Sequence, residues 1–152
     1  MADQLLLEEV ILDRIKNNAV VNAVLGSGSN CRVYPLAAPQ FAEYPCVIYE
    51  RESSNYSSSM SGDSNFNTGM FEVTIIAESF LTARNLSGNI RLALSGLRGS
   101  FTISAKTLVI NRFVIESDED MYVEPVEGKE YGLWTNVCKY SYSIILETPT
   151  LD

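Results

Sequence analysis

The residues best suited to chemistry form an acidic stretch over positions 116–130. Seven carboxylates and one lysine, Lys129, lie there, so this stretch holds six of the eight net negative charges of the 152-residue chain. Its acids are Glu116, Asp118, Glu119, Asp120, Glu124, Glu127 and Glu130. Two-metal hydrolases of phosphate esters need carboxylates that converge from separate elements, together with basic residues that bind the substrate. In this chain the acids follow one another and no basic cluster accompanies them.

A calcium site is also disfavoured, because Asp118, Glu119 and Asp120 lack the alternate spacing and the mid-loop glycine of an EF-hand. We therefore predict a solvated acidic loop over residues 116–130, without a metal. A wall of like charge is useful where a polyanion must slide past without sticking. The carboxylates proposed for such a wall are those of Asp118, Glu119, Asp120, Glu124 and Glu127.

Nucleophilic catalysis finds no support in the remaining residue types. The chain contains no histidine, which excludes a histidine base, and no serine stands three residues before a lysine. The three cysteines, Cys31, Cys46 and Cys138, form no CxxC pair and lie in strand-like stretches, where a thiol behaves as a small apolar group. We predict no catalytic residue, no cofactor site and no metal site.

Charge and hydropathy restrict the environment of the chain. A net charge of −8 gives no general attraction to phosphate backbones, which disfavours a reader of nucleic acids. No run approaches the roughly 18 apolar residues that cross a bilayer, and the first residues lack the basic region of a signal peptide. We expect a cytosolic, reduced chain without a membrane partner.

A second candidate segment covers residues 53–69, which are rich in serine and asparagine and poor in aliphatic residues. This composition predicts a long mobile loop. The loop carries three apolar side chains, Tyr56, Met60 and Phe66, which are suited to docking on a neighbouring subunit or another partner.

Hydrophobic periodicity predicts the elements that position these segments. Helices are expected over residues 3–17 and 19–25, and from Ser79 or Thr82 to Leu97. Alternating patterns predict strands over residues 31–34, 46–52, 70–78, 101–106, 108–117 and 132–147. This order indicates a single α+β domain over residues 1–152, with an antiparallel sheet and two main helices packed on one of its faces.

Several short signatures in this order resemble the tail-completion proteins of long-tailed bacteriophages, also called tail terminators or head–tail joining proteins. The most specific is a strand bracketed by prolines, in which Arg32-Val33-Tyr34-Pro35 and Ala38-Pro39-Gln40 lead to Tyr44-Pro45-Cys46-Val47-Ile48-Tyr49. An upstream run and two later strands are also similar to those of the family: residues 18–25, 71–77 and 140–145.

The resemblance implies a structural virion protein of the tail or neck, assembled in the host cytoplasm. It implies a ring, typically of six copies, that caps the tail tube and joins the tail to the head. The partners would be further copies of the chain, the tail tube protein and the head–tail connector. DNA would pass through the lumen without specific binding, along the acidic residues named above.

Other classes stay open from the sequence. A connector adaptor or a tail tube subunit would belong to the same machine. A small metal-dependent hydrolase would require ion binding by the acidic stretch, and a ligand-binding α+β module would require a pocket with converging polar groups.

Overall fold

The structure, a computed structural model, describes residues 6–26, 31–38, 43–59, 62–103, 106–124 and 132–146. Within these residues three helices and six strands follow one another in the order α1 (Leu6–Lys16), α2 (Ala19–Leu25), β1 (Val33–Pro35), β2 (Cys46–Ser59), β3 (Gly62–Ala77), α3 (Phe80–Leu94), β4 (Gly99–Ile103), β5 (Lys106–Val123) and β6 (Leu133–Leu146). No helix in the described ranges is long and apolar enough to cross a membrane.

The six strands form one sheet in the order β1-β2-β3-β6-β5-β4. All neighbours run antiparallel except β1 and β2, which are parallel. Two register shifts interrupt the pairing of β5 with β6, one between Ile110 and Arg112 and one between Ile115 and Ser117. Bulges of this kind increase the local twist of a strand, and here they decide which later side chains of β5 face the helices.

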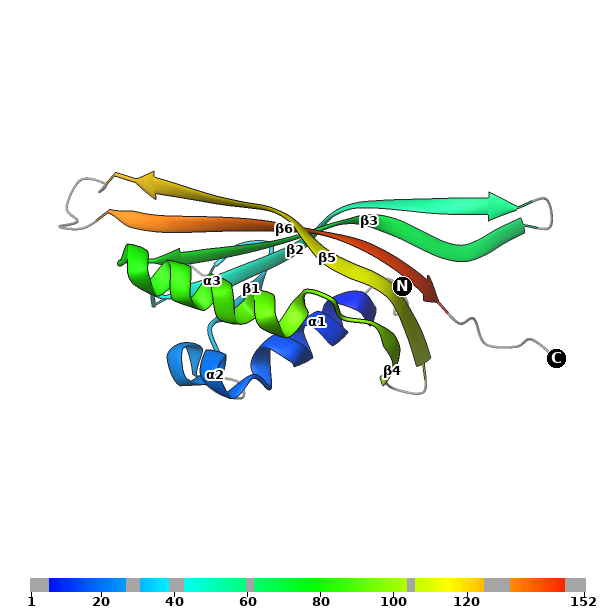
Figure 1. Ribbon diagram of the computed structural model, residues 1–152, viewed down its shortest axis with the longest axis horizontal. Coiled ribbons are helices and arrows are strands. Elements are labelled where there is room, and N and C mark those ends of the chain that lie inside the picture. Colours follow the sequence, from blue (N-terminus) through cyan, green and yellow to red (C-terminus); the bar gives the residue numbers. More distant parts are fainter. Residues whose placement is uncertain are drawn as a thin grey trace.

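The helices cover one face of the sheet and bury the alternate residues of its strands (Figure 1). On β3 this face carries Phe71, Val73, Ile75 and Ala77, all fully buried. The helices contribute the apolar stripe that the spacing predicts, with Leu7, Ile11, Ile15, Leu86, Ile90 and Leu94 among the most buried side chains. The predicted α+β class, with helices on one sheet face, is confirmed.

The two long hairpins of the sheet extend to opposite ends of the molecule (Figure 1). β2 and β3 pair from Cys46 with Ile76 out to Ser59 with Gly62, and we call the part over residues 53–69 the β2–β3 arm. β5 and β6 pair out to Val123 with Leu133, and we call the part of β5 and β6 over residues 116–124 and 132–139 the β5–β6 arm.

The predicted loop over residues 53–69 is wrong, because β2 and β3 continue through most of it. Ser53, Ser54, Asn55 and Tyr56 pair with Met70, Gly69, Thr68 and Asn67. The composition was misleading because backbone pairing does not require aliphatic side chains, and strand preference depends on the surroundings of each residue.

The predicted acidic loop over residues 116–130 is wrong in its first half. Glu116, Asp118, Glu119 and Asp120 belong to β5 and pair with β6 up to the end of the strand at Val123. Glu124 follows the strand, while Glu127 and Glu130 lie outside the described residues. Charged residues are rare in strands, but alternation places successive side chains on opposite faces, which separates Glu119 from Asp118 and Asp120.

Candidate functional site

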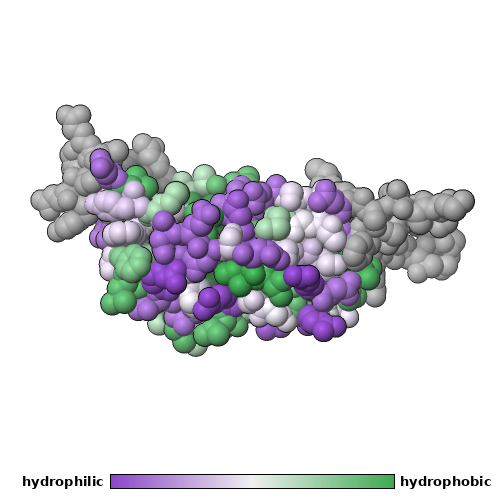
Figure 2. All heavy atoms as spheres, turned by 45° about the horizontal axis from the view of Figure 1, so that its top comes forward, coloured by the Kyte–Doolittle hydropathy of each residue, from purple (hydrophilic) through white to green (hydrophobic). Residues whose placement is uncertain are grey.

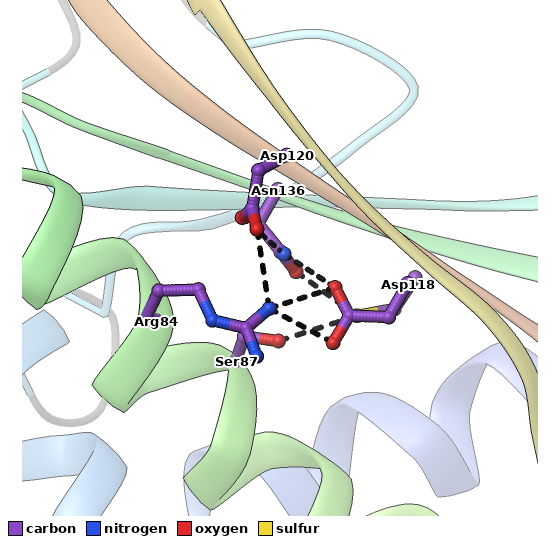
Figure 3. A network of polar contacts seen from close by, with 6 residues as sticks. Arg84, Ser87, Asp118, Asp120 and Asn136 are labelled. Carbon is purple, nitrogen blue, oxygen red and sulfur yellow. Dashed lines mark hydrogen bonds and ion pairs between the residues drawn. The ribbon is translucent and has the colours of Figure 1, made fainter.

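Two carboxylates of the β5–β6 arm point toward α3 and meet an arginine there (Figure 3). Nη1 of Arg84 lies 3.0 Å from both carboxylate oxygens of Asp118 and 3.4 Å from Oδ2 of Asp120. The Asp118 contact raises the pKa of Arg84, so the guanidinium stays charged. Because α3 supplies the cation and β5 the anions, the pair ties the arm to the helix layer.

Asn136 of β6 forms hydrogen bonds to the same two carboxylates. Its Nδ2 donates hydrogen bonds of 2.6 Å to Asp118 and 2.8 Å to Asp120. Its Oδ1 accepts a hydrogen bond from the thiol of Cys138, which in turn lies 3.3 Å from the hydroxyl of Ser87 on α3. Asn136 is fully buried, and burial raises the pKa of the Cys138 thiol. We call these residues the β5–β6 brace: Arg84, Ser87, Asp118, Asp120, Asn136 and Cys138.

The brace uses its charges for structure. Hydrogen bonds to charged groups are about twice as strong as neutral ones, and a connected buried network fixes the positions of its members. Within the described ranges no three Cys, Asp or Glu side chains come together in a way that could hold a metal ion.

The other acids of the arm lie on the face of the sheet that the helices leave uncovered. Glu119 pairs with Val137 on this face, and Glu116 accepts hydrogen bonds from Ser141 and Arg112. Figure 2 turns this side toward the reader and shows hydrophilic residues interspersed with hydrophobic ones. Glu50, Glu52 and Glu72 join them around Lys139, whose pKa is raised first by its hydrogen bond to Glu52. The uncovered face is therefore acidic over its central strands.

A second polar cluster lies at the base of the β2–β3 arm. Arg51 forms an ion pair of 2.9 Å with Glu8 of α1 and lies over the ring of Tyr142, 5.6 Å from its centroid. The Tyr142 hydroxyl donates to the carbonyl of Ser53 at 3.0 Å and lies 2.9 Å from the hydroxyl of Ser54. We call this group the β2–β3 brace, because like the first it connects a sheet arm to a helix.

Gly69 is required in this brace. It stands opposite Tyr142 in the β3–β6 pairing, and a Cβ atom at this position would collide with the Ser53 carbonyl and the Tyr142 hydroxyl. The absence of a side chain lets Tyr142 reach from β6 across β3 to β2.

Hollows on the described surface lie beside the β2–β3 arm and beside α1. One of about 420 Å³ lies beside the β2–β3 arm and is lined by Ser53, Asn55, Thr68, Gly69, Met70, Arg112, Glu116, Ser141, Tyr142 and Ser143. Another of about 500 Å³ is lined by Asp13, Arg14, Asn17, Asn18, Leu92, Ala93 and Phe101. In the hollow beside the β2–β3 arm, the Glu116 carboxylate accepts hydrogen bonds from Arg112 and Ser141, so these three side chains bind one another.

An aromatic cluster marks the outer part of the β5–β6 arm. Trp134 packs against Phe80 and Tyr122, with ring centroids 5.0 and 4.8 Å apart. Phe80 is 46% exposed and Tyr122 is 48% exposed, so much of this cluster is accessible. Exposed aromatic residues are typical of protein–protein contacts.

Comparison with known proteins agrees with a contact-making molecule. A model of the family described as "Tail completion protein gp17" matches residues 9–123. The chain belongs to the tail completion protein gp17 family. It is therefore a structural virion protein of the tail or neck.

A solved structure with the same fold supports the arrangement of this tail completion protein. A chain in "Virion of native gene transfer agent (GTA) particle" is 18% identical, with a TM-score of 0.60, over 88% of this chain and 91% of the other. No curated protein matches the sequence.

The structure describes only part of the three apolar residues that the sequence predicted as contacts with a neighbouring subunit or another partner. The backbones of Tyr56 and Phe66 belong to β2 and β3, opposite Asn67 and Ile145, and their side chains lie outside what the structure describes. Met60 lies outside the described residues. Their role in docking stays a prediction.

Sequence reasoning missed the braces of the tail completion protein. Their arginines stand on α3 and β2, far along the chain from Asp118 on β5 and Glu8 on α1. The sequence could have indicated part of the first brace, because alternation along a strand puts Asp118 and Asp120 on one face and Glu119 on the other. No sequence spacing shows which helix lies beneath them.

Proposed function

We propose that this chain forms a ring, with six copies, that closes the head-proximal end of the tail tube and joins the tail to the head. The observation that carries this proposal is the match of residues 9–123 to the tail completion family. The partners are then other copies of the chain, the tail tube protein and the head–tail connector.

The shape of the chain supports a ring. The β2–β3 and β5–β6 arms extend to opposite ends, and each is tied to the helix layer by a brace (Figure 1). A head-to-tail contact between two different surfaces repeats from copy to copy and closes into a ring when the rotation allows it.

The charge of the uncovered sheet face supports a DNA channel. Glu50, Glu52, Glu72, Glu116 and Glu119 lie there, and only two of them are ion-paired among the described residues, with Lys139 and Arg112. An acidic wall offers the phosphate backbone no counter-charge, so DNA passes without being held. In this proposal Glu119 faces the lumen, whereas Asp118 and Asp120 are engaged in the brace; Glu124, which follows the end of β5, is a candidate for the lumen from its charge alone.

Particles that lack this protein test the joining role. We expect free heads and free tails by electron microscopy, and joined particles after purified protein is added. Images of the joined particles should show a ring of six copies at the head-proximal end of the tail. Heads and tails that join without the protein, or density that places it along the tube, would contradict the proposal.

A charge-reversal variant tests the channel. Glu72→Lys and Glu119→Lys together change the uncovered face by four charges, and should retain DNA in a gel-shift assay at low salt and release it at high salt. Glu9→Lys with Asp13→Lys, two substitutions on α1, is the matched control and should bind less. Equal DNA binding by both variants would argue against a channel along this face.

A further inference from the structure

We infer that the ring closes by β-strand addition between copies: the open edge of β5 on one copy pairs with the open edge of β2 on the next. This inference rests on the proposed ring and names the surfaces that build it. It is argued from backbone pairing, charge and strand direction.

Each arm has one open edge among the described residues. β4 pairs with β5 only up to Ile110, and the end of α3 covers the next part through the 2.7 Å hydrogen bond from the Gly96 amide to the Phe113 carbonyl. From Glu116 to Val123 no described strand lies on the outer side of β5. On β2, contacts with the β1 segment end at Tyr49, whose carbonyl accepts from Leu36, and from there to Ser59 no described strand lies on its outer side. Open edges offer unpaired N–H and C=O groups that template pairing with another chain.

Charge decides against the pairing of two β5 edges. This edge carries Glu116, Asp118, Glu119 and Asp120 in five residues, and their ion-pair partners Arg84 and Arg112 offset only two of the four negative charges. Like charges placed opposite each other across two strands are destabilising, so two copies of this edge repel. The contact therefore needs a different edge.

The β2 edge has the complementary chemistry. Residues 53–59 are Ser53, Ser54, Asn55, Tyr56, Ser57, Ser58 and Ser59, and none is charged. Hydroxyl and amide groups donate hydrogen bonds, whereas an ionised carboxylate only accepts them. Glu119 and Asn55 both lie on the uncovered face, since they pair with Val137 and Thr68, so a joined sheet places them on the same side.

Strand direction permits the contact without turning one copy over. β2 and β3 are antiparallel, as are β3 and β6, and β6 and β5, so β5 runs opposite to β2. Two copies in the same orientation thus present antiparallel edges to each other. The open parts belong to arms at opposite ends of the molecule, so neighbouring copies are shifted lengthwise until the two arms overlap, and each copy uses one arm toward each neighbour (Figure 1). The exposed Tyr122 ring on β5 would be covered by the incoming arm and add apolar contact.

Paired cysteines test this contact directly. Glu119→Cys or Met121→Cys on β5 is combined in one chain with Ser53→Cys or Asn55→Cys on β2. The four combinations sample three antiparallel registers, because Glu119 with Asn55 and Met121 with Ser53 belong to the same one. The native cysteines are buried, so mild oxidation acts on the introduced ones. At least one combination should give a ladder of disulfide-linked oligomers that ends at six copies. Variants with a single introduced cysteine should give no covalent oligomer. Glu119→Cys with Ser100→Cys on the edge strand β4 is the matched control and should give no ladder.

A charge variant tests the same contact without cross-linking. Asn55→Asp adds a carboxylate to the β2 edge and should weaken assembly about tenfold, and Glu119→Lys in the same chain should restore it. Ser100→Asp adds the same charge to β4 and should leave assembly unchanged. Rings seen by electron microscopy without a ladder in any combination, or covalent dimers from a single cysteine, would overturn the β2–β5 contact and leave the ring intact. Particles that join without this protein would overturn the proposed function itself.

Discussion

At the scale of single residues, the buried polar groups of the chain divide into those that are used and those that are not. Asn136 is fully buried and connects two carboxylates and a thiol. Tyr140 is equally buried, but its hydroxyl finds no hydrogen-bond partner among the described residues. Burying an unsatisfied hydroxyl costs free energy, so the two tyrosines of β6 should respond differently to the loss of their hydroxyl groups.

Tyr140→Phe should therefore raise the free energy of unfolding by about 1 kcal/mol, because it removes a desolvated hydroxyl and keeps the ring stacked on Phe113. Tyr142→Phe is the control on the same strand and face. It loses the hydrogen bond to the Ser53 carbonyl and should lower the free energy of unfolding by about 1 kcal/mol. Urea denaturation measures both. A loss of stability in Tyr140→Phe as large as that in Tyr142→Phe would show that the Tyr140 hydroxyl is bonded.

The three thiols should titrate late. Burial raises the pKa of Cys31, Cys46 and Cys138 above the ordinary value of 9.0. A thiol with a raised pKa in the folded chain stabilises the fold fully below its unfolded pKa, and this contribution is lost as the pH rises through the folded pKa. The free energy of unfolding should thus fall above about pH 9, and a thiol reagent at pH 8 should label the folded chain slowly and the unfolded chain at once. Rapid labelling of the folded chain would contradict the burial of these residues.

At the scale of elements, the two braces explain how strands so polar stay in place. In each brace an arginine forms an ion pair with a carboxylate of another element. Arg84 of α3 pairs with Asp118 of β5, and Arg51 of β2 pairs with Glu8 of α1. The Glu8 and Arg51 side chains are 17% and 12% exposed, so this pair is shielded from solvent more than a surface pair would be. The arms are therefore positioned by these ion pairs in addition to backbone pairing and, in the β5–β6 arm, to the packing of Trp134 against Phe80 of α3.

Asn136→Asp tests the first brace. The substitution replaces a donor that serves Asp118 and Asp120 by a third carboxylate in a buried position, and should lower the free energy of unfolding by about 3 kcal/mol at pH 7. The loss should shrink toward pH 4, since protonation removes the repulsion. Asn85→Asp at an exposed position of α3 is the control. Thermal unfolding between pH 4 and pH 7 measures the stability of both variants. An equal loss of stability with the same pH dependence in the two would contradict the brace.

Gly69→Ala tests the second brace. The added methyl group collides with the Ser53 carbonyl and the Tyr142 hydroxyl, so β2 and β3 must separate or Tyr142 must move. We expect a loss of about 1–3 kcal/mol in urea denaturation. Gly88→Ala on α3 is the matched control, because a Cβ atom there meets nothing within 4 Å, and it should stabilise the helix by up to about 1 kcal/mol. A neutral Gly69→Ala would mean that the crossing of Tyr142 is not needed.

The sequence predicted the covered part of the sheet better than its arms. Alternation identified the covered part of β3, predicted over residues 70–78, because Phe71, Val73 and Ile75 face a helix layer and the alternate residues do not. Helix α2 was predicted at its observed bounds, with Asn18 capping its first turn. The β2–β3 arm and the outer part of β5 were predicted as loops because these residues lack a continuous apolar face, whereas β6 was predicted as a strand over residues 132–147 and is observed over Leu133–Leu146. The strands of the arms depend on pairing with distant segments, such as Asp118 with Cys138, and on arginines brought by other elements, which spacing along the chain does not reveal.

At the scale of the whole molecule, two arms extend in opposite directions from one helix-covered body (Figure 1). A molecule with one such arm could form a pair, whereas two different arms allow each copy to contact two neighbours. In the proposed ring the acidic uncovered face would be repeated around the assembly, which would bring the carboxylates of all copies to one continuous surface. Folding and assembly are separable in this arrangement, because the helix-packed core lies apart from the outer part of each arm.

Shortening the β2–β3 arm tests that separation. Deletion of residues 57–67, with a short glycine turn in their place, removes the outer arm and the candidate contacts Met60 and Phe66, while the core residues of β3 from Phe71 onward remain. The variant should unfold cooperatively and sediment as a monomer, and it should fail to join heads to tails.

A second variant, Tyr56→Ser with Met60→Ser and Phe66→Ser, keeps the arm and removes its apolar side chains. If edge pairing alone builds the contact, this variant assembles. If docking of the apolar side chains is also needed, it fails as the deletion does. Joining of heads to tails at the normal level by the deletion variant would reject any role of the arm in assembly.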